Sequence, residues 1–315
     1  MNIGIDMMGG DFAPEEAIKG LFSYLSSRLS SDETNIFCIG DEVLINALFK
    51  QYHINQSSVI VIHAAEIIGM HEHPTKALKE KPDSSLAIGF DMLAKGKIDA
   101  LISAGNTGAM LIGTLFSIKA IPGVLRPAIS TIIPKLNGGN GLLLDVGLNA
   151  DCKPDNLNQF AVLGSLYAKN ILGIKDPKVG LLNVGEEEGK GNILAQSTYP
   201  LLKENSQIHF IGNIEGRDVF MDKADVIVCE GFTGNIILKM AESFLTIAQN
   251  RKINDDYINS FDYENHGGTP ILGVSKPVII GHGVSKKKAF YHMILLAEKM
   301  ISSKVCEKMI DSFKI

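Results

Sequence analysis

Residues 98 to 108 read Ile98-Asp99-Ala100-Leu101-Ile102-Ser103-Ala104-Gly105-Asn106-Thr107-Gly108, a short apolar run that passes directly into a polar, glycine-rich segment. A run of roughly four to eight apolar residues that ends in turn residues is typical of a strand covered on both faces. The residues that follow, through Lys119, have the composition of a helix. The stretch therefore predicts a strand, a loop and a helix, in that order.

The same alternation extends along the whole chain. Strands are predicted at residues 2–6, 36–40, 59–63, 98–103, 128–133, 141–146, 178–184, 208–212, 225–229 and 277–280. Helices are predicted at residues 14–27, 107–119, 155–172, 192–202 and 234–249, among others. Apolar strands that alternate with amphipathic helices are typical of a mainly parallel sheet, so we expect a layered α/β fold.

Length and composition limit the classes of protein to which the chain can belong. Its 315 residues suffice for one large α/β domain over residues 1–315, or for two lobes around a cleft. A boundary between lobes would fall near Pro122-Gly123 or Gly138-Gly139. A net charge of -5 argues against nucleic-acid binding. Asp6 interrupts the apolar stretch that a signal peptide would need, and the four cysteines show no CxxC spacing, so we expect a cytoplasmic protein.

Polar, glycine-rich segments follow the predicted strands at six places. In open α/β sheets ligands bind beyond the carboxyl ends of the strands, so we expect these segments to line one cleft. The alternative is that each segment only forms a turn. The residues predicted to line the cleft are Asp6, Gly9, Gly10, Asp11, Asp145, Asn149, Asn183, Thr233 and His282.

One of these segments is a candidate phosphate site. Gly105 and Gly108 allow a tight turn, and Ser103, Asn106 and Thr107 offer hydrogen-bond donors just before a helix. A helix N-terminus presented in this way suits a phosphate. The alternative is that Asn106 or Thr107 is an ordinary helix N-cap.

Lys190, which lies between two glycines, is a candidate for binding phosphate or a developing oxyanion, although a solvated surface lysine is the alternative. Three residues separate Gly185 from Gly189, where a nucleotide-binding P-loop needs four, and no dinucleotide fingerprint is present. No cofactor is therefore predicted. No metal is predicted either, because His71-Glu72-His73 lacks further ligands. A covalent route through Cys152, which lies beside Lys153, is a minor alternative.

Several motifs occur in one order along nearly the whole chain, at residues 6–11, 71–74 with Lys79 and 83–85, 103–108, 144–147 with 151–154, 180–187, 210–218 and 231–235. In these motifs the sequence resembles the phosphate acyltransferase (PlsX) family of bacterial phospholipid synthesis. The resemblance implies a three-layer α/β/α fold like that of isopropylmalate dehydrogenases and phosphotransacetylases. It also implies an enzyme that converts a fatty acyl-[acyl carrier protein] and inorganic phosphate into acyl phosphate and free carrier, without metal or nucleotide.

The resemblance further implies that Lys190 and Asn235 are the catalytic residues, and that the protein forms a homodimer with peripheral membrane contact. The chain departs from the family in three places. Residues 239–262 are fewer than expected for the helical hairpin used in dimerisation and membrane contact, which weakens both expectations. Val284 replaces a usual serine, and Gly189 replaces a common threonine.

Acyl carrier protein is acidic, so its docking requires a cationic patch. Lys286, Lys287 and Lys288 form one candidate patch, and Lys79 with Lys81 forms another, although charge runs are often only solvated. Three other functions stay open from the residues alone. They are a phosphotransacetylase-like enzyme that uses acyl-coenzyme A, a non-catalytic acyl- or phosphate-binding protein, and a dehydrogenase of similar fold.

Overall fold

The computed structural model describes residues 1–27, 34–55, 57 and 59–314, and it divides into two compact units. Unit 1 comprises Met1–Lys119, Tyr263–Pro270 and Val274–Cys306. Unit 2 comprises Ala120–Asp262, Ile271–Gly273 and Glu307–Ile315. The first crossing between units lies next to the predicted boundary at residues 122–123. Gly138-Gly139, the other predicted boundary, lies inside unit 2 in a turn between two strands, because the two glycines close a hairpin there.

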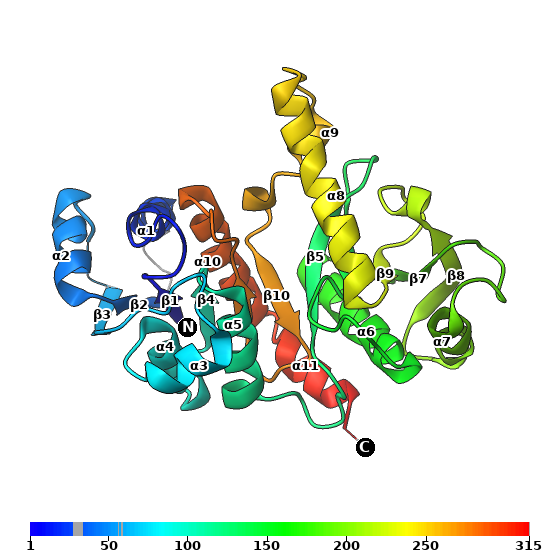
Figure 1. Cartoon of the computed structure of the whole chain (residues 1–315), viewed down its shortest axis with the longest axis horizontal. Coiled ribbons are helices and arrows are strands. Elements are labelled where there is room, and N and C mark those ends of the chain that lie inside the picture. The colour runs from blue at the N-terminus through cyan, green and yellow to red at the C-terminus, as the bar shows by residue number, and fades with distance from the viewer. Residues whose placement is uncertain (28–33, 56, 58, 315) are drawn as a thin grey trace. The chain divides into compact units, whose positions relative to one another are not determined.

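Unit 1 contains a mainly parallel sheet in the order β3-β2-β1-β4-β11-β10 (Figure 1). Its strands are β1 (Asn2–Asp6), β2 (Asn35–Gly40), β3 (Val59–His63), β4 (Ala100–Ser103), β11 (Val278–Ile280) and the first residues of β10 (Thr269–Leu272). Only β10 is antiparallel to its neighbour, pairing Thr269 with Ile280. Its helices are α1 (Glu15–Ser27), α2 (Glu42–Gln51), α3 (Pro74–Glu80), α4 (Ser85–Ala94), α5 (Thr107–Gly113), the π-helical η1 (Thr114–Ile118), the 3-10 turn η4 (Tyr263–Asn265) and α10 (Lys287–Ser302).

Helices cover both faces of this sheet. Helix α4 packs on β1, β2 and β4, whereas α10 packs on β1 and β4 together with α1. In Figure 1 the α1–α10 pair and α4 lie on opposite sides of these strands. The strands are apolar along their whole length because both faces are covered, and Ile3, Ile5 and Ile102 have no exposed surface.

Unit 2 contains strands in the order β10-β5-β6-β9-β7-β8. They are β5 (Ala128–Pro134), β6 (Asn140–Leu144), β7 (Lys178–Asn183), β8 (His209–Glu215), β9 (Val226–Val228) and the last residues of β10. The β5–β6 pair is antiparallel, and β6, β9, β7 and β8 are parallel. The helices are α6 (Pro154–Tyr167), the π-helical η2 (Ala168–Leu172), α7 (Ile193–Glu204), the 3-10 turn η3 (Gly216–Asp218), α8 (Gly231–Asn250) and α9 (Asp256–Asn259); α11 (Val305–Ser312) runs from unit 1 into unit 2.

The predicted α/β class and mainly parallel pairing are confirmed, and each predicted strand is present with shifts of a few residues at its ends. Two corrections concern the elements themselves. Strand β10 was not predicted, because its Pro270 disfavours a strand assignment. Helix α8 begins three residues before the predicted start, at Gly231, since Glu230 caps it. In the segment 239–262, α8 continues to Asn250 and only the short α9 follows.

None of the helices in the described part of the chain is long and apolar enough to cross a membrane.

Candidate active site

Three predicted loops meet at the carboxyl edge of the sheet in unit 1. Strands β1, β4 and β11 are parallel neighbours, so the segments that follow them lie side by side. The Asp11 N–H donates to the Gly283 carbonyl at 2.8 Å, and the Gly281 N–H donates to the Ser103 carbonyl at 2.8 Å. The predicted residues Asp6, Gly9, Gly10, Asp11, Ser103, Gly105 and His282 therefore belong to one group of contacting loops.

A buried carboxylate and hydroxyl fix the shape of this group. The Ser103 hydroxyl donates to Asp6 Oδ2 at 2.7 Å and accepts the Gly105 N–H at 2.9 Å. Burial raises the pKa of the Asp6 carboxyl. A Cβ on Gly9 would lie 2.6 Å from Asp6 Oδ2 and 2.7 Å from the Gly105 nitrogen, so only glycine fits there. Asp6 and Ser103 thus bond to each other and to the loops that follow their strands.

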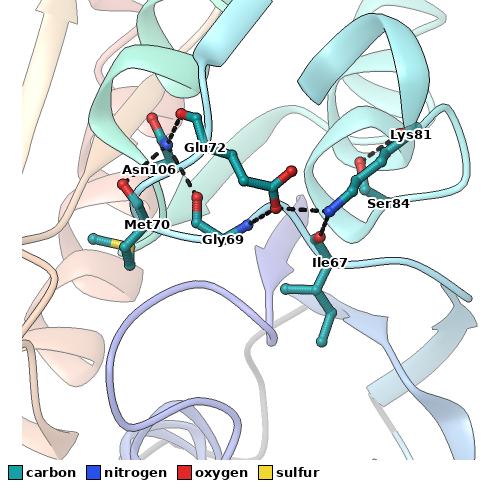
Figure 2. A network of polar contacts seen from close by, with 7 residues as sticks. All are labelled: Ile67, Gly69, Met70, Glu72, Lys81, Ser84 and Asn106. Carbon is teal, nitrogen blue, oxygen red and sulfur yellow. Dashed lines mark hydrogen bonds and ion pairs between the residues drawn. The ribbon is translucent and has the colours of Figure 1, made fainter. Parts of the chain in front are cut away.

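Asn106 joins this edge to the segment before α3, as Figure 2 shows. Its amide group donates to the carbonyls of Gly69, Met70 and Glu72 at 3.1, 3.1 and 3.0 Å. Its Oδ1 accepts the Ala109 N–H at 3.0 Å, which makes it the N-cap of α5. Asn106 is therefore a helix N-cap, which was the alternative to a phosphate site, and its side chain has no donor left for a phosphate.

The remaining residues of the predicted phosphate segment differ in environment. Thr107 is exposed at the first residue of α5. A Cβ on Gly108 would lie 2.4 Å from Pro74 Cγ, so this glycine lets α5 approach the start of α3. The first N–H groups of a helix have no intrahelical partner, and only that of Ala109 is satisfied by Asn106. A phosphate role for this segment stays a prediction.

Two charged residues of the 71–81 segment, Glu72 and Lys81, stabilise the fold. Glu72 accepts the Gly69 N–H and pairs with Lys81, each at 2.6 Å, and these bonds from Lys81 and Gly69 lower the pKa of Glu72 (Figure 2). Lys81 also donates to the Ile67 carbonyl. In the predicted Lys79–Lys81 patch, the ammonium group of Lys81 is therefore already bonded within the protein. Lys286, Lys287 and Lys288 are exposed where α10 begins.

A second group of predicted residues lies at the carboxyl edge of the sheet in unit 2. Strands β6, β9 and β7 are parallel neighbours, and Asp145, Glu230 and Asn183 stand at or just past their ends. Asp145 is fully buried and accepts the N–H groups of Ile129 and Asn149. Asn149 Nδ2 also donates to it, at 2.8 Å. Asp145 and Asn149 therefore shape the loop after β6.

The start of α8 places Asn235 against that loop. The Glu230 carboxylate accepts the N–H and the hydroxyl of Thr233, which caps the helix. A Cβ on Gly234 would lie 1.8 Å from the Asp145 carbonyl oxygen, so glycine is required for the close approach. Asn235 Nδ2 donates to the Val146 carbonyl at 3.1 Å, which holds the amide beside Gly147.

Lys190 lies on the loop between β7 and α7, and its side chain is exposed. The Lys190 N–H donates to the Glu187 carbonyl, and its own carbonyl accepts Asn183 Nδ2 at 3.0 Å. The backbone of Lys190 is thereby held, while its ammonium group pairs with no carboxylate of the described chain. Such an ammonium group is available to an anionic ligand.

A pocket of about 340 Å³ opens between these loops, inside unit 2. The predicted residues Asn183 and Thr233 line it, together with Asn192 and Glu230. Most of its wall is apolar and was not predicted, because each side chain has the sequence pattern of an ordinary core residue. These residues are Leu157, Leu181, Leu182, Val184, Leu194, Ala195 and Ile237.

Two other chemical features of unit 2, a cysteine and a cluster of carboxylates, give weaker support for a functional role. Burial raises the pKa of the Cys152 thiol to about 12, with further contributions from Asp145 and Glu230, so a thiolate route is disfavoured. The carboxylates of Glu186, Glu215 and Asp218 lie within 4.8 Å of one another. Lys223 bridges Glu186 and Asp218, and Arg217 pairs with Glu215, so the cluster is neutralised by its own cations.

The predicted residues thus form one group in each unit. In unit 2, Asn183 and Thr233 line the pocket, and Lys190 and Asn235 lie close to its lining residues in the chain. The 6–11, 103–108 and 281–285 segments form the group in unit 1. The single cleft expected from the sequence stays a prediction. Gly147 and Glu230 were missed as site residues, although the positions of both directly after predicted strands were a usable signal.

Known proteins resemble the chain over nearly its full length. Residues 1–253 and 249–308 match the profile of the family described as fatty acid synthesis protein. The phosphate acyltransferase of Dictyoglomus turgidum is 42% identical over 330 residues, covering 99% of this chain and 97% of that protein. The phosphate acyltransferase of Halothermothrix orenii is 43% identical over 325 residues, covering 97% and 96%.

Solved structures show the same fold at low sequence identity. A phosphotransacetylase from Streptococcus pyogenes has a TM-score of 0.70 at 17% identity, covering 98% of this chain and 94% of that one. The phosphotransacetylase EutD from Staphylococcus aureus has a TM-score of 0.65 at 17% identity, covering 95% and 94%. The profile match and the high coverage of its relatives lead to one conclusion: the chain belongs to the phosphate acyltransferase family of fatty acid synthesis proteins.

Proposed function

We propose that the protein transfers a fatty acyl group from acyl carrier protein to inorganic phosphate, yielding acyl phosphate for phospholipid synthesis in the cytoplasm. The proposal rests on the arrangement of Lys190, Asn235 and the pocket in unit 2, together with the family to which the chain belongs. The ammonium group of Lys190 pairs with no carboxylate among the described residues, and Val146 holds the amide of Asn235. Both residues lie close in the chain to residues that line a largely apolar pocket at the carboxyl edge of β9 and β7.

The reaction needs positioning more than activation of its nucleophile. Near neutral pH, phosphate is already substantially dianionic, so an oxygen can attack the thioester carbonyl carbon without a general base. An O–C bond forms, and the carbonyl oxygen becomes an oxyanion. The C–S bond then breaks, the carbonyl re-forms, and the carrier thiolate leaves and takes a proton from solvent.

Lys190 and Asn235 supply charge and a hydrogen bond to these species. The Lys190 ammonium group attracts the phosphate dianion as a point charge. Asn235 uses one N–H for the Val146 carbonyl, which leaves the second N–H for the oxyanion. Removing an oxyanion donor typically lowers kcat by about 100- to 1000-fold.

Hydroxylamine trapping of acyl phosphate tests the proposal directly. Purified protein is incubated with phosphate and acyl-[acyl carrier protein], and acyl hydroxamate is measured. We expect product with the wild type and a loss of at least about 100-fold in Lys190→Ala. Lys175→Ala, which removes another exposed lysine of unit 2, is the matched control and keeps the wild-type rate. Equal rates in the two variants would refute the assignment of Lys190.

The thioester donor is tested in the same assay with acyl-coenzyme A in place of the carrier thioester. We propose that the carrier is preferred and that it docks on Lys286, Lys287 and Lys288. A higher kcat/KM with acyl-coenzyme A would favour the phosphotransacetylase-like alternative.

We also propose that the protein forms a homodimer with peripheral membrane contact. Large apolar side chains of α8, among them Phe232, Met240 and Ile247, are about half or more exposed, which supports both properties. Sedimentation equilibrium measures the dimer, and co-sedimentation with phospholipid vesicles measures the membrane contact. A monomer that stays in the supernatant would contradict the proposal.

A further inference from the structure

The pocket in unit 2 is built from four elements that converge beyond two strand ends. Leu157 comes from α6, Leu181 from β7, Leu194 from α7 and Ile237 from α8. Leu157 and Leu181 are almost completely buried and form the inner wall. The pocket therefore offers an apolar interior that is reached from the edge carrying the reactive residues.

Most polar side-chain atoms at this pocket are bonded within the protein. Asn192 Oδ1 accepts the Ala195 N–H at 2.8 Å, and Asn183 Nδ2 donates to the Lys190 carbonyl. The Thr233 hydroxyl donates to Glu230. The charged group that lines the pocket is the carboxylate of Glu230, which repels phosphate. The chemistry of the pocket thus disfavours an anion and fits an alkyl chain.

The pocket adjoins the proposed reacting groups without containing them. Lys190 lies one residue before the wall residue Gly191. On α8, Thr233 and Ile237 share a helix face four residues apart and line the pocket, whereas Asn235 turns toward Val146. A carbonyl carbon held by Lys190 and Asn235 would lie at the rim, and the chain attached to it would point inward.

We propose that this pocket holds the alkyl chain of the acyl donor and that Leu194 and Ile237 set the chain-length preference. The inference rests on the proposed function. Burying one methylene contributes about 0.8 kcal/mol, or about fourfold in kcat/KM. The wild type should therefore gain about fourfold per methylene until the pocket is filled, and then gain little.

The experiment measures kcat/KM for acyl thioesters of increasing chain length. Leu194→Trp and Ile237→Phe reduce the space, so the plateau moves to shorter chains, with a loss of about 10-fold or more for the longest chains. Ile193→Trp and Ile236→Phe are matched controls, because these neighbours lie on the same helices, are 85% and 51% exposed, and do not line the pocket. Two independent pairs keep the test valid if one variant fails to fold.

Each outcome is decisive. A shifted plateau in Leu194→Trp or Ile237→Phe, with an unchanged profile in the control, supports the inference. Wild-type turnover with the same profile in variant and control overturns it and leaves the proposed function standing. An equal loss at every chain length also overturns it, because it would place the constant pantetheine arm in the pocket. No turnover with any thioester in the wild type refutes the proposed function itself, and the inference with it.

Discussion

Replacing Asn106 with aspartate separates the two tasks of this side chain. Aspartate keeps an oxygen for the Ala109 N–H, so the cap of α5 survives. The amide donors disappear, and the carbonyls of Gly69, Met70 and Glu72 then face a carboxylate. The substitution therefore removes the connection between α5 and the 69–72 segment without removing the cap.

The size of the effect follows from the lost bonds. The amide has two N–H groups, so about two net hydrogen bonds of about 1 kcal/mol each are lost. Leaving one of these part-buried carbonyls unpaired costs a further ~1 kcal/mol, and Asn106 itself is only 5% exposed. A charged cap at the helix N-terminus returns up to about 1 kcal/mol. The expected net loss is about 2 to 3 kcal/mol, or roughly 5–10 °C in Tm.

Two measurements check this prediction: the Tm from thermal unfolding, and the rate of amide hydrogen exchange in the folded protein. Exchange should become faster at Gly69, whose N–H is held by Glu72 in the same segment. Asn192→Asp is the matched control, because Asn192 caps α7 through the Ala195 N–H but is exposed and makes no further side-chain bond that the structure records. The control should change stability by less than about 0.5 kcal/mol. Equal losses of stability in the two variants would show that the bonds from the Asn106 amide to the carbonyls of the 69–72 segment contribute nothing beyond the helix cap.

Two further predictions concern unit 2. Gly147→Ala should lower kcat about 10- to 100-fold with little change in KM, since its Cβ would lie 3.0 Å from Asn235 Nδ2. Gly138→Ala is the control, because Gly138 also has a positive φ but its Cβ would have no atom within 4 Å, so this variant should retain activity. A loss of activity in both variants would show that backbone strain causes the effect. Burial and nearby carboxylates raise the pKa of Cys152 to about 12, so alkylation of its thiol by iodoacetamide should be slow at pH 8. The alkylation rate should rise about tenfold per pH unit toward pH 12, and fast labelling at pH 8 would contradict this prediction. The Cys152→Ser variant should retain acyl transfer.

The strands and their edge were predictable because a doubly covered strand leaves a continuous apolar run. Ile3 and Ile5 in β1, and Leu142–Leu144 in β6, are such runs, and glycine-rich polar segments follow both. Strand β10 was not predictable in this way, since Pro270 disfavours a strand assignment. Local pattern therefore identified the strands with continuous apolar runs but not the strand that a proline interrupts.

The sequence indicated candidate site residues but not the contacts that they make. Lys190 and Asn235 could be named from motifs, but the anchoring of Asn235 by Val146 spans 89 residues of sequence. Asn106 was expected to bind a ligand, and it instead holds carbonyls 34 to 37 residues away. The pocket was invisible for the same reason, because leucines from α6, β7 and α7 form a cavity only after the chain has folded.

The chain path through unit 1 has a consequence for synthesis on the ribosome. Strand β4 pairs with β11, whose residues 278–280 are made almost two hundred residues after β4. Helix α10, which covers β1 and β4, is translated later still. Unit 1 therefore keeps one sheet border and one apolar face open until residues 278–302 have emerged from the ribosome. Domains that are continuous at the N-terminus usually fold early, so a nascent chain of this kind depends more than most on protection from aggregation.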